Sequence, residues 1–525
     1  MAVNQIRVSS RTLPKRARIA PRLRYAVMAL LVSSPVLGIL GFDYYSGRLG
    51  VIWPKNDVVD QKGGRVIKVP PGGNLQGAID SAQSGDVVEL QAGAVYSGQI
   101  NLSNKPLTDY VTIRSSGIDD LPANKRVTPG QRGSMATIQS GMMGRAAVMA
   151  ANGAHHYRFI GIEFTPSSSM YNYGLVQLGH GEFKPANVPH DIEIDRSYIH
   201  PFRSGVTRRG IALNSANTTI KNSYIEGIAF PGEETQGICG WSGTRNVKIL
   251  NNYIEAGAEN IMFGGSDPDN ADLIPSDIEV RGNTLNKPAE WKGKATVKAL
   301  FEIKNAKRLM FAGNLLTNNW EGSAFRVTVR DQDGGAPFST IEDVTIRDNV
   351  IKGAGEGINI LGRDDTYPSQ TLQRLVIANN LFLDIGGKEF EGSGYFIQIA
   401  AGNDITIANN TVFNLGNITT FYGDMPTGFV FRNNVTSHGN YGVHGLDVRS
   451  EQARAMYLNN VFMNLAHVGD GDTAYPQGNA FVRNANDVGF VNISDGDYRI
   501  DPRSKYSAKG CDLSRFTPDL LSAIH

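Results

Sequence analysis

A short motif recurs along most of this 525-residue chain. Each copy is a run of β-forming residues that reaches an Asn or Ser and continues with an apolar pair, as in "TIKNSYI", "KILNNYI" and "TIRDNVI". The shared position is occupied by Ser197, Ser223, Asn252, Asn283, Asn314, Asn349, Asn380, Asn410, Asn434 and Asn460. Successive copies are 24 to 35 residues apart, which is a period typical of solenoids. We therefore expect stacked coils joined by loops of variable length.

The residues inside each repeat alternate between apolar and other types, which predicts strands rather than helices. We expect one aligned set to point into the core: Ile211, Ile238, Ile261, Phe301, Phe325, Ile358 and Ile397. Their neighbours should point outward: Ala212, Cys239, Met262, Glu302, Arg326, Asn359 and Gln398. The recurrent Asn suits such stacking, because it tolerates a left-handed turn and its amide can bond to its counterpart one coil away. An ordinary exposed loop Asn is the alternative.

With these repeats, residues 64–515 resemble the right-handed parallel β-helix of the pectate-lyase-like superfamily. The resemblance implies an all-β fold, a single-stranded right-handed parallel β-helix with an N-terminal capping helix. Asn74 is the expected N-cap of that helix, ahead of an apolar stripe that begins at Leu75. Residues 496–510 resemble a closing segment, and residues 516–525 are predicted to be a C-terminal tail.

The N-terminal region has the pattern of a membrane-targeting segment. Residues 1–25 contain seven basic and no acidic residues, which predicts a basic cytoplasmic tail. Residues 26–42 are apolar or small and predict a signal anchor or a signal peptide, followed by a linker at residues 43–63. Either alternative places the repeats outside the cytoplasm, in the periplasm or at the cell surface. The pattern favours an uncleaved signal anchor, which would also make the membrane a partner through this segment.

The composition excludes two functional classes. The 51 Lys and Arg residues balance 50 Asp and Glu residues, so the net charge of +1 argues against a nucleic-acid partner. The two Cys residues are too few for a thiolate zinc cluster or a disulfide scaffold.

Three long acidic loops, at residues 264–277, 330–343 and 362–373, should leave consecutive coils on one side. Carboxylate and amide oxygens that converge there are the ligands Ca²⁺ prefers, and we expect Glu302, Asn260 and Asp333 to bind the metal. The alternative is that Asp residues only initiate turns in solvated loops.

Glu302, Lys304 and Arg326 are expected on one outward face of adjacent coils. Such a cationic pair suits the cleavage of a uronic-acid polymer by β-elimination, which needs a base and a counter-charge for the enolate-like intermediate. Lys304 is the predicted base, and Arg326 is predicted to neutralise the substrate carboxylate. The alternative is an ion pair between Glu302 and Arg326 on a solvated face.

The stretch "LFEIKNAKRLMFAGNLLTNNWEGSAFRVTVR" resembles polysaccharide lyases of the chondroitinase B and alginate-lyase type. The resemblance implies a catalytic Lys and Arg on adjacent coils, with acidic calcium ligands nearby. Arg326 follows Asn314 by twelve residues, as in that family. The family's Lys aligns on Asn305, one residue after Lys304, and Glu302 alone represents its paired Glu ligands.

The predicted substrate is thus an acidic polysaccharide. Asn359, Arg330 and Gln398 are expected to bind its polar groups, and Trp241 and Trp320 to stack on sugar faces. Two alternatives remain open: a noncatalytic cell-surface solenoid that binds glycan or has a structural or adhesive role, and a hydrolase that uses the paired Asp364 and Asp365.

Overall fold

The computed structural model describes residues 64–141, 144–202, 205–464 and 475–524. Residues Gln61–His525 form a compact unit, the second of two along the chain. The predicted cytoplasmic tail, targeting segment and linker at residues 1–63 lie outside the described residues. Among the residues that are described, no helix is long and apolar enough to span a membrane.

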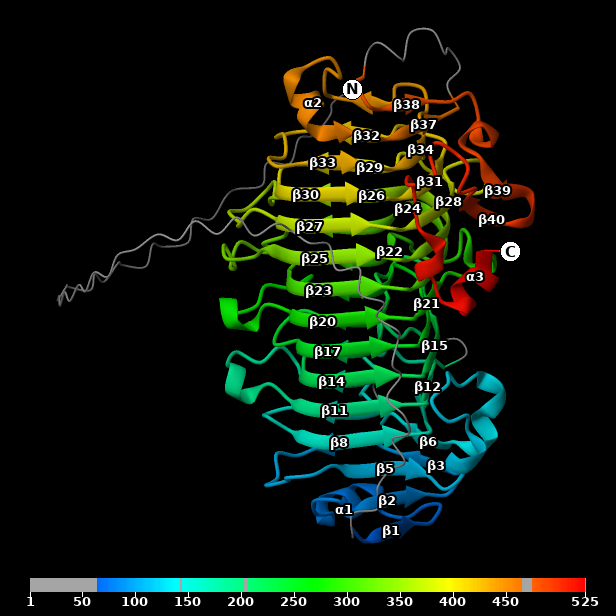
Figure 1. The fold of residues 1–525 in the computed structure, drawn as a ribbon. Helices are drawn as coiled ribbons and strands as arrows, with labels where there is room; N and C mark the ends of the chain where they lie inside the picture. Colours follow the sequence, from blue (N-terminus) through cyan, green and yellow to red (C-terminus); the bar gives the residue numbers. More distant parts are fainter. Residues whose placement is uncertain (1–63, 142–143, 203–204, 465–474, 525) are drawn as a thin grey trace, which may run out of the picture. The chain divides into compact units, whose positions relative to one another are not determined.

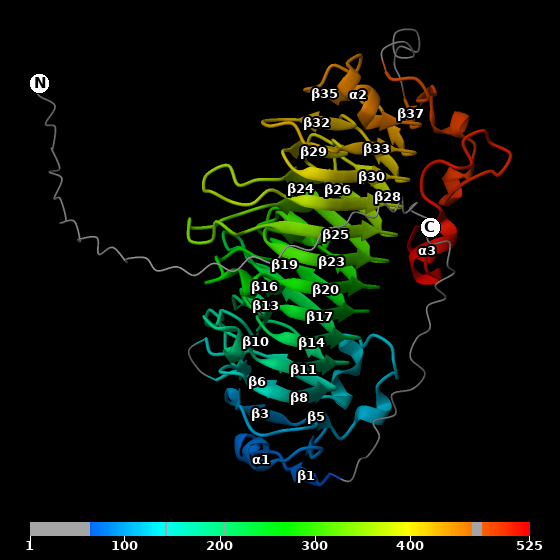
Figure 2. The ribbon, with the colours of Figure 1, turned by 60° about the vertical axis from the view of Figure 1, so that its left-hand side comes forward.

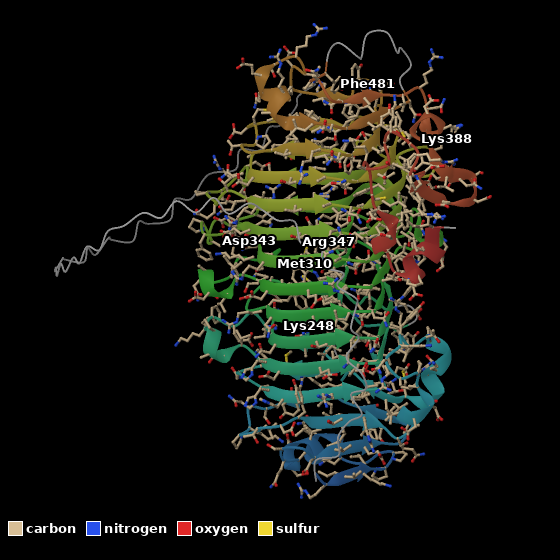
Figure 3. The ribbon with its side chains drawn as sticks, viewed as in Figure 1. Lys248, Met310, Asp343, Arg347, Lys388 and Phe481 are labelled. Carbon is tan, nitrogen blue, oxygen red and sulfur yellow. The ribbon has the colours of Figure 1, made fainter. Side chains whose placement is uncertain are left out.

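The second unit is a right-handed parallel β-helix, in which each coil contributes strands to stacked parallel sheets (Figure 1). One sheet of the described chain has 14 strands: β1 (Val66–Val69), β2 (Val87–Leu90), β5 (Val111–Ser115), β8 (His155–Ile160), β11 (His190–Asp195), β14 (Ala216–Lys221), β17 (Arg245–Leu250), β20 (Ser276–Arg281), β23 (Ala306–Ala312), β25 (Ile341–Arg347), β27 (Gln373–Ala378), β30 (Asn403–Ala408), β33 (Val430–Arg432) and β36 (Tyr457–Leu458). Its outer face carries Lys248, Met310 and Asp343 (Figure 3). The predicted all-β fold is confirmed.

The remaining coil strands form a larger sheet with two runs of paired strands, seen beside the first sheet in Figure 2. The first run, called here the site run, contains β4 (Ile100–Leu102), β7 (Val148–Ala150), β10 (Val176–Leu178), β13 (Arg209–Leu213), β16 (Gln236–Gly240), β19 (Glu259–Phe263), β22 (Ala299–Ile303), β24 (Leu315–Thr328), β26 (Val350–Leu361), β29 (Ile397–Ala400), β32 (Thr419–Phe421) and β35 (Val443–His444). The second run contains β3 (Val95–Ser97), β6 (Ala136–Gln139), β9 (Ile162–Thr165), β12 (Tyr198–Ile199), β15 (Tyr224–Ile228), β18 (Tyr253–Ala256), β21 (Thr284–Asn286), β28 (Leu381–Ile385), β31 (Thr411–Asn414), β34 (Val435–Ser437), β37 (Val461–Met463) and β38 (Ala480–Phe481). The long strands β24 and β26 belong to both runs.

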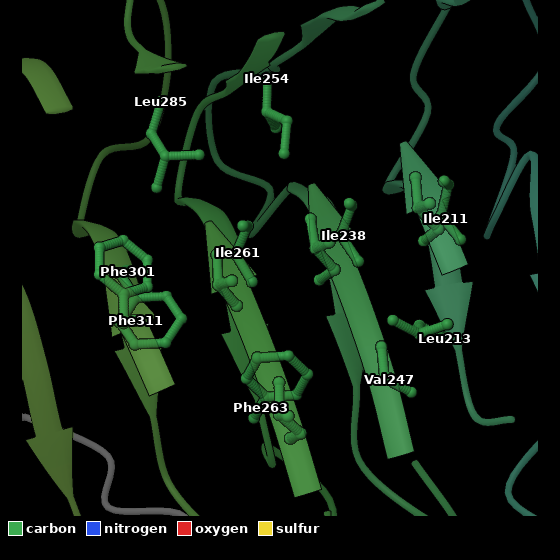
Figure 4. Packing of buried hydrophobic residues seen from close by; sticks show 14 of the residues in the cluster. Ile211, Leu213, Ile238, Val247, Ile254, Ile261, Phe263, Leu285, Phe301 and Phe311 are labelled. Carbon is green, nitrogen blue, oxygen red and sulfur yellow. The ribbon is translucent and has the colours of Figure 1, made fainter. Parts of the chain in front are cut away.

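The inward set predicted from the alternation is confirmed. All seven of its Ile and Phe residues are fully buried and in register on successive strands of the site run. Figure 4 shows Ile211, Ile238, Ile261 and Phe301 side by side in the core. Because each side chain packs on its equivalent one coil away, the core is continuous along the solenoid.

The predicted ladder of amides is also confirmed, with one correction. Asn314 Oδ1 accepts hydrogen bonds from the backbone N and the Nδ2 of Asn283, at 2.9 and 3.0 Å, and the pattern repeats between the other Asn positions. The left-handed backbone conformation belongs instead to the residue just before, for example Gly313 (φ 65°) and Asn379 (φ 57°). The ladder residue is therefore selected for its amide, and its predecessor for the turn.

Short helices cover parts of the solenoid. In α1 (Leu75–Ser81), the Asn74 side chain accepts a hydrogen bond from the backbone N of Gly77, as expected of the N-cap. Helix α2 (Glu451–Met456) packs near β33 and β36. The segment predicted to close the fold, residues 496–510, contains β40 (Asp497–Ile500), which pairs antiparallel with β39 (Phe490–Asn492).

The C-terminal residues differ from the predicted tail. Helix α3 (Pro518–Ile524) buries Leu520 and Ile524 in a cluster with Val350 and Leu381 of the second run. The helix was not expected from the sequence because the apolar surface that α3 covers is formed by residues far away in the chain.

Candidate active site

The outward face of the site run carries polar residues in register on adjacent coils. Glu302 lies opposite Arg326, which lies opposite Asn359, which lies opposite Gln398. Parallel strands place such neighbours about 5 Å apart. The row of Glu302, Arg326 and Asn359 that the sequence predicts is therefore present.

A buried charge cluster lies at the start of this row. The Lys298 Nζ is 3.0 Å from Glu259 Oε1 and 3.5 Å from Glu302 Oε2. It also lies 3.2 Å from an oxygen of Glu234. Glu259 is held on its other side by Gln236, whose Nε2 donates a hydrogen bond to Oε2 at 2.9 Å. One ammonium thus contacts three carboxylates from three successive coils.

The two inner carboxyl groups of this cluster differ in their pKa. Burial, together with the neighbouring Glu302, raises the pKa of Glu259. Burial also tends to raise the pKa of Glu302, but the positive charges of Lys304 and Lys298 hold this pKa below the usual value. Glu302 is therefore the carboxylate that stays ionised, whereas Glu259 retains a proton more readily.

Several buried polar atoms of this region have no hydrogen-bond partner among the described residues: Gln236 Oε1, Glu259 Oε1, Glu302 Oε2, Asn319 Oδ1 and Arg326 Nε. Buried polar atoms are normally paired, and exceptions call for an explanation. Their concentration on four consecutive coils, β16, β19, β22 and β24, marks this face as the candidate site.

Lys304 lies immediately after β22 and is partly exposed. Its backbone N donates a hydrogen bond to the Phe263 carbonyl at 2.7 Å. The previous coil passes close to it at Gly264 (φ 96°), where a Cβ atom would lie 2.8 Å from the Lys304 Cβ. A glycine is needed there both for the backbone conformation and for this close approach.

The predicted substrate-binding residues have different surroundings. Asn359 donates a hydrogen bond to Gln398 at 3.2 Å and accepts one from the Tyr422 hydroxyl at 3.4 Å. Arg330 is ion-paired with Asp365 and lies 3.7 Å from an oxygen of Asp364. Asn359 and Gln398 thus continue the row beyond Arg326, whereas Arg330 joins the loop that borders it.

The two predicted sugar-stacking rings are both covered by protein. Trp241 is 8% exposed and packs with Ala212, Cys239 and Met262, and its ring centroid lies 4.9 Å from the Arg209 guanidinium. Trp320 is 5% exposed and belongs to β24. Neither ring offers an open face, because packing against neighbouring coils uses the apolar surface that a sugar requires.

The three residues predicted to bind calcium have separate surroundings. The Asn260 amide accepts a hydrogen bond from the buried Lys287 Nζ at 3.0 Å, Glu302 contacts Lys298, and Asp333 is exposed on its loop. Within the described ranges, no group of three or more His, Cys, Asp or Glu residues is arranged to hold a metal ion.

The acidic loops are instead organised by their own backbone. Asp267 accepts hydrogen bonds from the backbone N of Gln332, Asp333 and Gly335, at 2.6 to 3.2 Å. Asp364 accepts them from Asp331, Thr366 and Tyr367. These carboxylates fix the loop shape, as Asp commonly does in turns, and the paired Asp364 and Asp365 are both engaged.

The sequence did not single out Glu259, Lys298 or Gln236. A weak signal exists in the i, i+4 spacing of Lys298 and Glu302. The alternation places Glu259 on the same side of the strand as Ile261, two residues later, so the sequence predicts that it points inward. In the structure Ile261 lies in the core, whereas the Glu259 carboxylate contacts Lys298. The alternation breaks at Asn260, whose amide donates hydrogen bonds to the Ile254 and Asn286 carbonyls at the corner of the coil.

No protein-family model matches this chain, and no curated protein sequence is similar to it. Solved structures are similar to it in fold. The PL6 family alginate lyase AlyGC superimposes with a TM-score of 0.55 at 14% identity, covering 87% of this chain and 58% of that chain. A mutant of AlyGC with one Arg changed to Ala gives 0.51 at 13% identity, with the same coverage. PfbA, a surface adhesin of Streptococcus pneumoniae, gives 0.44 at 14% identity, covering 74% and 86%.

The likeness to AlyGC agrees with the strand topology: the chain has the fold of a right-handed parallel β-helix. It spans 58% of the length of AlyGC. At such low identity the likeness concerns the fold, and the chemistry has to be argued from the residues of the site.

Proposed function

We propose that this protein acts outside the cytoplasm and cleaves an acidic, uronate-containing polysaccharide by β-elimination. The observation that carries the proposal is Arg326, which lies in register with Glu302, is partly exposed, and forms no ion pair among the described residues. A guanidinium with unused donors suits a carboxylate, which it binds in a bidentate manner.

In the proposed reaction, Arg326 binds the carboxylate of one uronate unit and stabilises the negative charge that develops there. The Lys304 amine takes the proton from the carbon next to that carboxylate. The electron pair of the broken C–H bond forms a C=C bond, and the bond to the glycosidic oxygen breaks. The leaving oxygen takes a proton from water, and the new C=C bond leaves an unsaturated sugar at the end of one product.

Glu302 has a supporting part in this proposal. Its ionised carboxylate lies within electrostatic reach of both Lys304 and Arg326. Asn359 and Gln398 continue the row and supply amide groups for the hydroxyls of neighbouring sugar units. Residues 26–42, as a signal anchor or a signal peptide, would bring the repeats to the compartment where such polymers occur.

A noncatalytic glycan-binding solenoid is the second candidate. The ion pairs of Lys298 with Glu259 and Glu302 favour it, because they give the face a stable charge balance that requires no turnover. A hydrolase based on Asp364 and Asp365 has less support, since both carboxylates bind loop partners.

The proposal is tested by incubating the full chain with a panel of uronate polymers and with neutral polysaccharides as controls. β-Elimination yields fragments with an unsaturated terminal sugar, which ultraviolet absorbance and mass spectrometry detect. Binding without fragments supports the noncatalytic solenoid. Fragments that have gained water identify a hydrolase instead.

A further inference from the structure

Lys298 is the centre of the charge cluster described above. Its side chain is 20% exposed, whereas the side chains of Glu259 and Glu302 are 0% and 3% exposed. Glu234, the third carboxylate, lies at the solvent side and is 48% exposed. The ammonium therefore separates two enclosed carboxyl groups from the surface.

The electrostatics keep this ammonium charged. Burial disfavours the charge, but Glu259, Glu302 and Glu234 together raise the pKa of Lys298 above its usual value. Lys298 is therefore unsuited to accept a proton, unlike the base that β-elimination requires. Its role at this face is that of a fixed positive charge.

The surrounding oxygens are aimed at this charge and held in place. Glu259 Oε1 and Glu302 Oε2 are buried and face the Lys298 Nζ at 3.0 and 3.5 Å. Gln236 fixes the other oxygen of Glu259. Lys287 binds the carbonyls of Ala256 and Gly257, at 3.0 and 2.6 Å, and so fixes the backbone just before Glu259.

Carboxylate oxygens are the ligands that Ca²⁺ and Mg²⁺ take in proteins. We infer that the Lys298 ammonium takes the place of a divalent metal ion at this site, so that the site keeps its charge balance without bound metal. Removing the Lys298 side chain should then leave carboxylates that bind Ca²⁺ or Mg²⁺. This inference rests on the site of the proposed function, but binding and stability test it without any substrate.

The test compares the full chain with Lys298→Ala and with the double variant Lys298→Ala/Glu302→Gln. Each protein is melted in the presence of a chelator and in the presence of CaCl₂ or MgCl₂, and metal binding is measured by calorimetry. Lys292→Ala is the matched control. Lys292 is an exposed lysine whose Nζ lies 3.3 Å from Glu391, which is not one of the three carboxylates of the cluster.

The wild type and Lys292→Ala should show the same Tm with and without metal. Lys298→Ala should melt lower in chelator and recover several degrees with Ca²⁺ or Mg²⁺, because a ligand that binds only the folded state raises its stability. The double variant should lose this recovery.

Three results would overturn the inference. One is a wild-type Tm that rises when metal is added, together with a Tm of Glu302→Gln that does not change with metal. This would show that the site binds metal beside Lys298. Another is a Lys298→Ala variant that responds to neither metal. The third is a Lys298→Ala chain that folds in neither buffer, since a replaceable cation should rescue it. A lack of polysaccharide cleavage would affect none of these readouts.

Discussion

Glu302 and Arg326 lie opposite each other on β22 and β24, yet the Glu302 carboxylate pairs with Lys298. Among the described residues, no ion pair joins Glu302 to Arg326, so the cross-strand pair that the sequence offered as an alternative is absent. The consequence is an Arg326 guanidinium that remains available for an external anion.

Arg326 should be essential for turnover. Arg326→Met removes the group that stabilises charge in the transition state, and we expect kcat to fall by about 10²–10³-fold, as for other such donors. Arg326→Lys should recover only part of this loss, because lysine cannot bind a carboxylate in a bidentate manner. Initial rates on the cleaved polymer measure the effect.

Arg308→Met is the control for Arg326. Arg308 belongs to β23 of the 14-stranded sheet and pairs with Asp277 at 2.6 Å on an exposed face. It should leave kcat and KM unchanged. Equal losses in the two variants would assign the effect to general stability rather than to the site.

Lys304 should be required for chemistry and not for binding. Lys304→Met removes the amine and Lys304→Arg replaces it with a guanidinium that cannot act as a base, so both should lose turnover while oligosaccharide affinity changes little. Calorimetry of an uncleaved oligosaccharide and rate measurements separate the two effects. Lys307→Met, on the other sheet, is the control, and a fully active Lys304→Arg would contradict the role of Lys304 as base.

Glu259 should make stability depend on pH. Burial and Glu302 raise its folded-state pKa, so its proton stabilises the fold fully below the ordinary glutamate pKa of about 4.3, and this contribution is lost as pH rises through the raised pKa. Glu259→Gln imitates the protonated form and should flatten this decline. Melting curves from acidic to alkaline pH test it, with Glu302, Lys298 and Lys287 as the facing charges. Parallel pH profiles would contradict the prediction.

Asn314 should contribute strongly to stability. Asn314→Ala leaves the backbone N of Asn283 and the Val280 carbonyl without their partners in the core, which should cost about 2–4 kcal/mol of unfolding free energy. Asn246→Gly removes one exposed amide bond to Asn217, suits the left-handed backbone at this position (φ 52°), and should cost less than about 0.5 kcal/mol. Denaturant unfolding of the two variants measures the contrast, and equal costs would argue against the ladder.

The fold was predictable from sequence because its rules are local and repeated. The alternation that buries Ile238 and Ile261 and the Asn ladder recur at every coil, so each copy supports the others. Helix α3 was not predictable, because it packs on Val350 and Leu381, far away in the sequence.

The site was predictable only in part. Arg326 and Asn359 follow from strand register. Lys298 comes from the loop before β22, and its reach to Glu259 depends on how the coil turns a corner. Loop conformation likewise determines that Asp267 binds backbone N–H groups instead of a metal. Neither property is encoded in a periodic pattern.

The most direct test of the account compares one uronate polymer with its carboxyl-reduced form, using the same preparation of the full chain. If Arg326 binds the carboxylate of the unit that loses its proton, the native polymer should yield unsaturated fragments and the reduced polymer none. Equal cleavage of both polymers, or no unsaturated product from any native uronate polymer, would contradict the account.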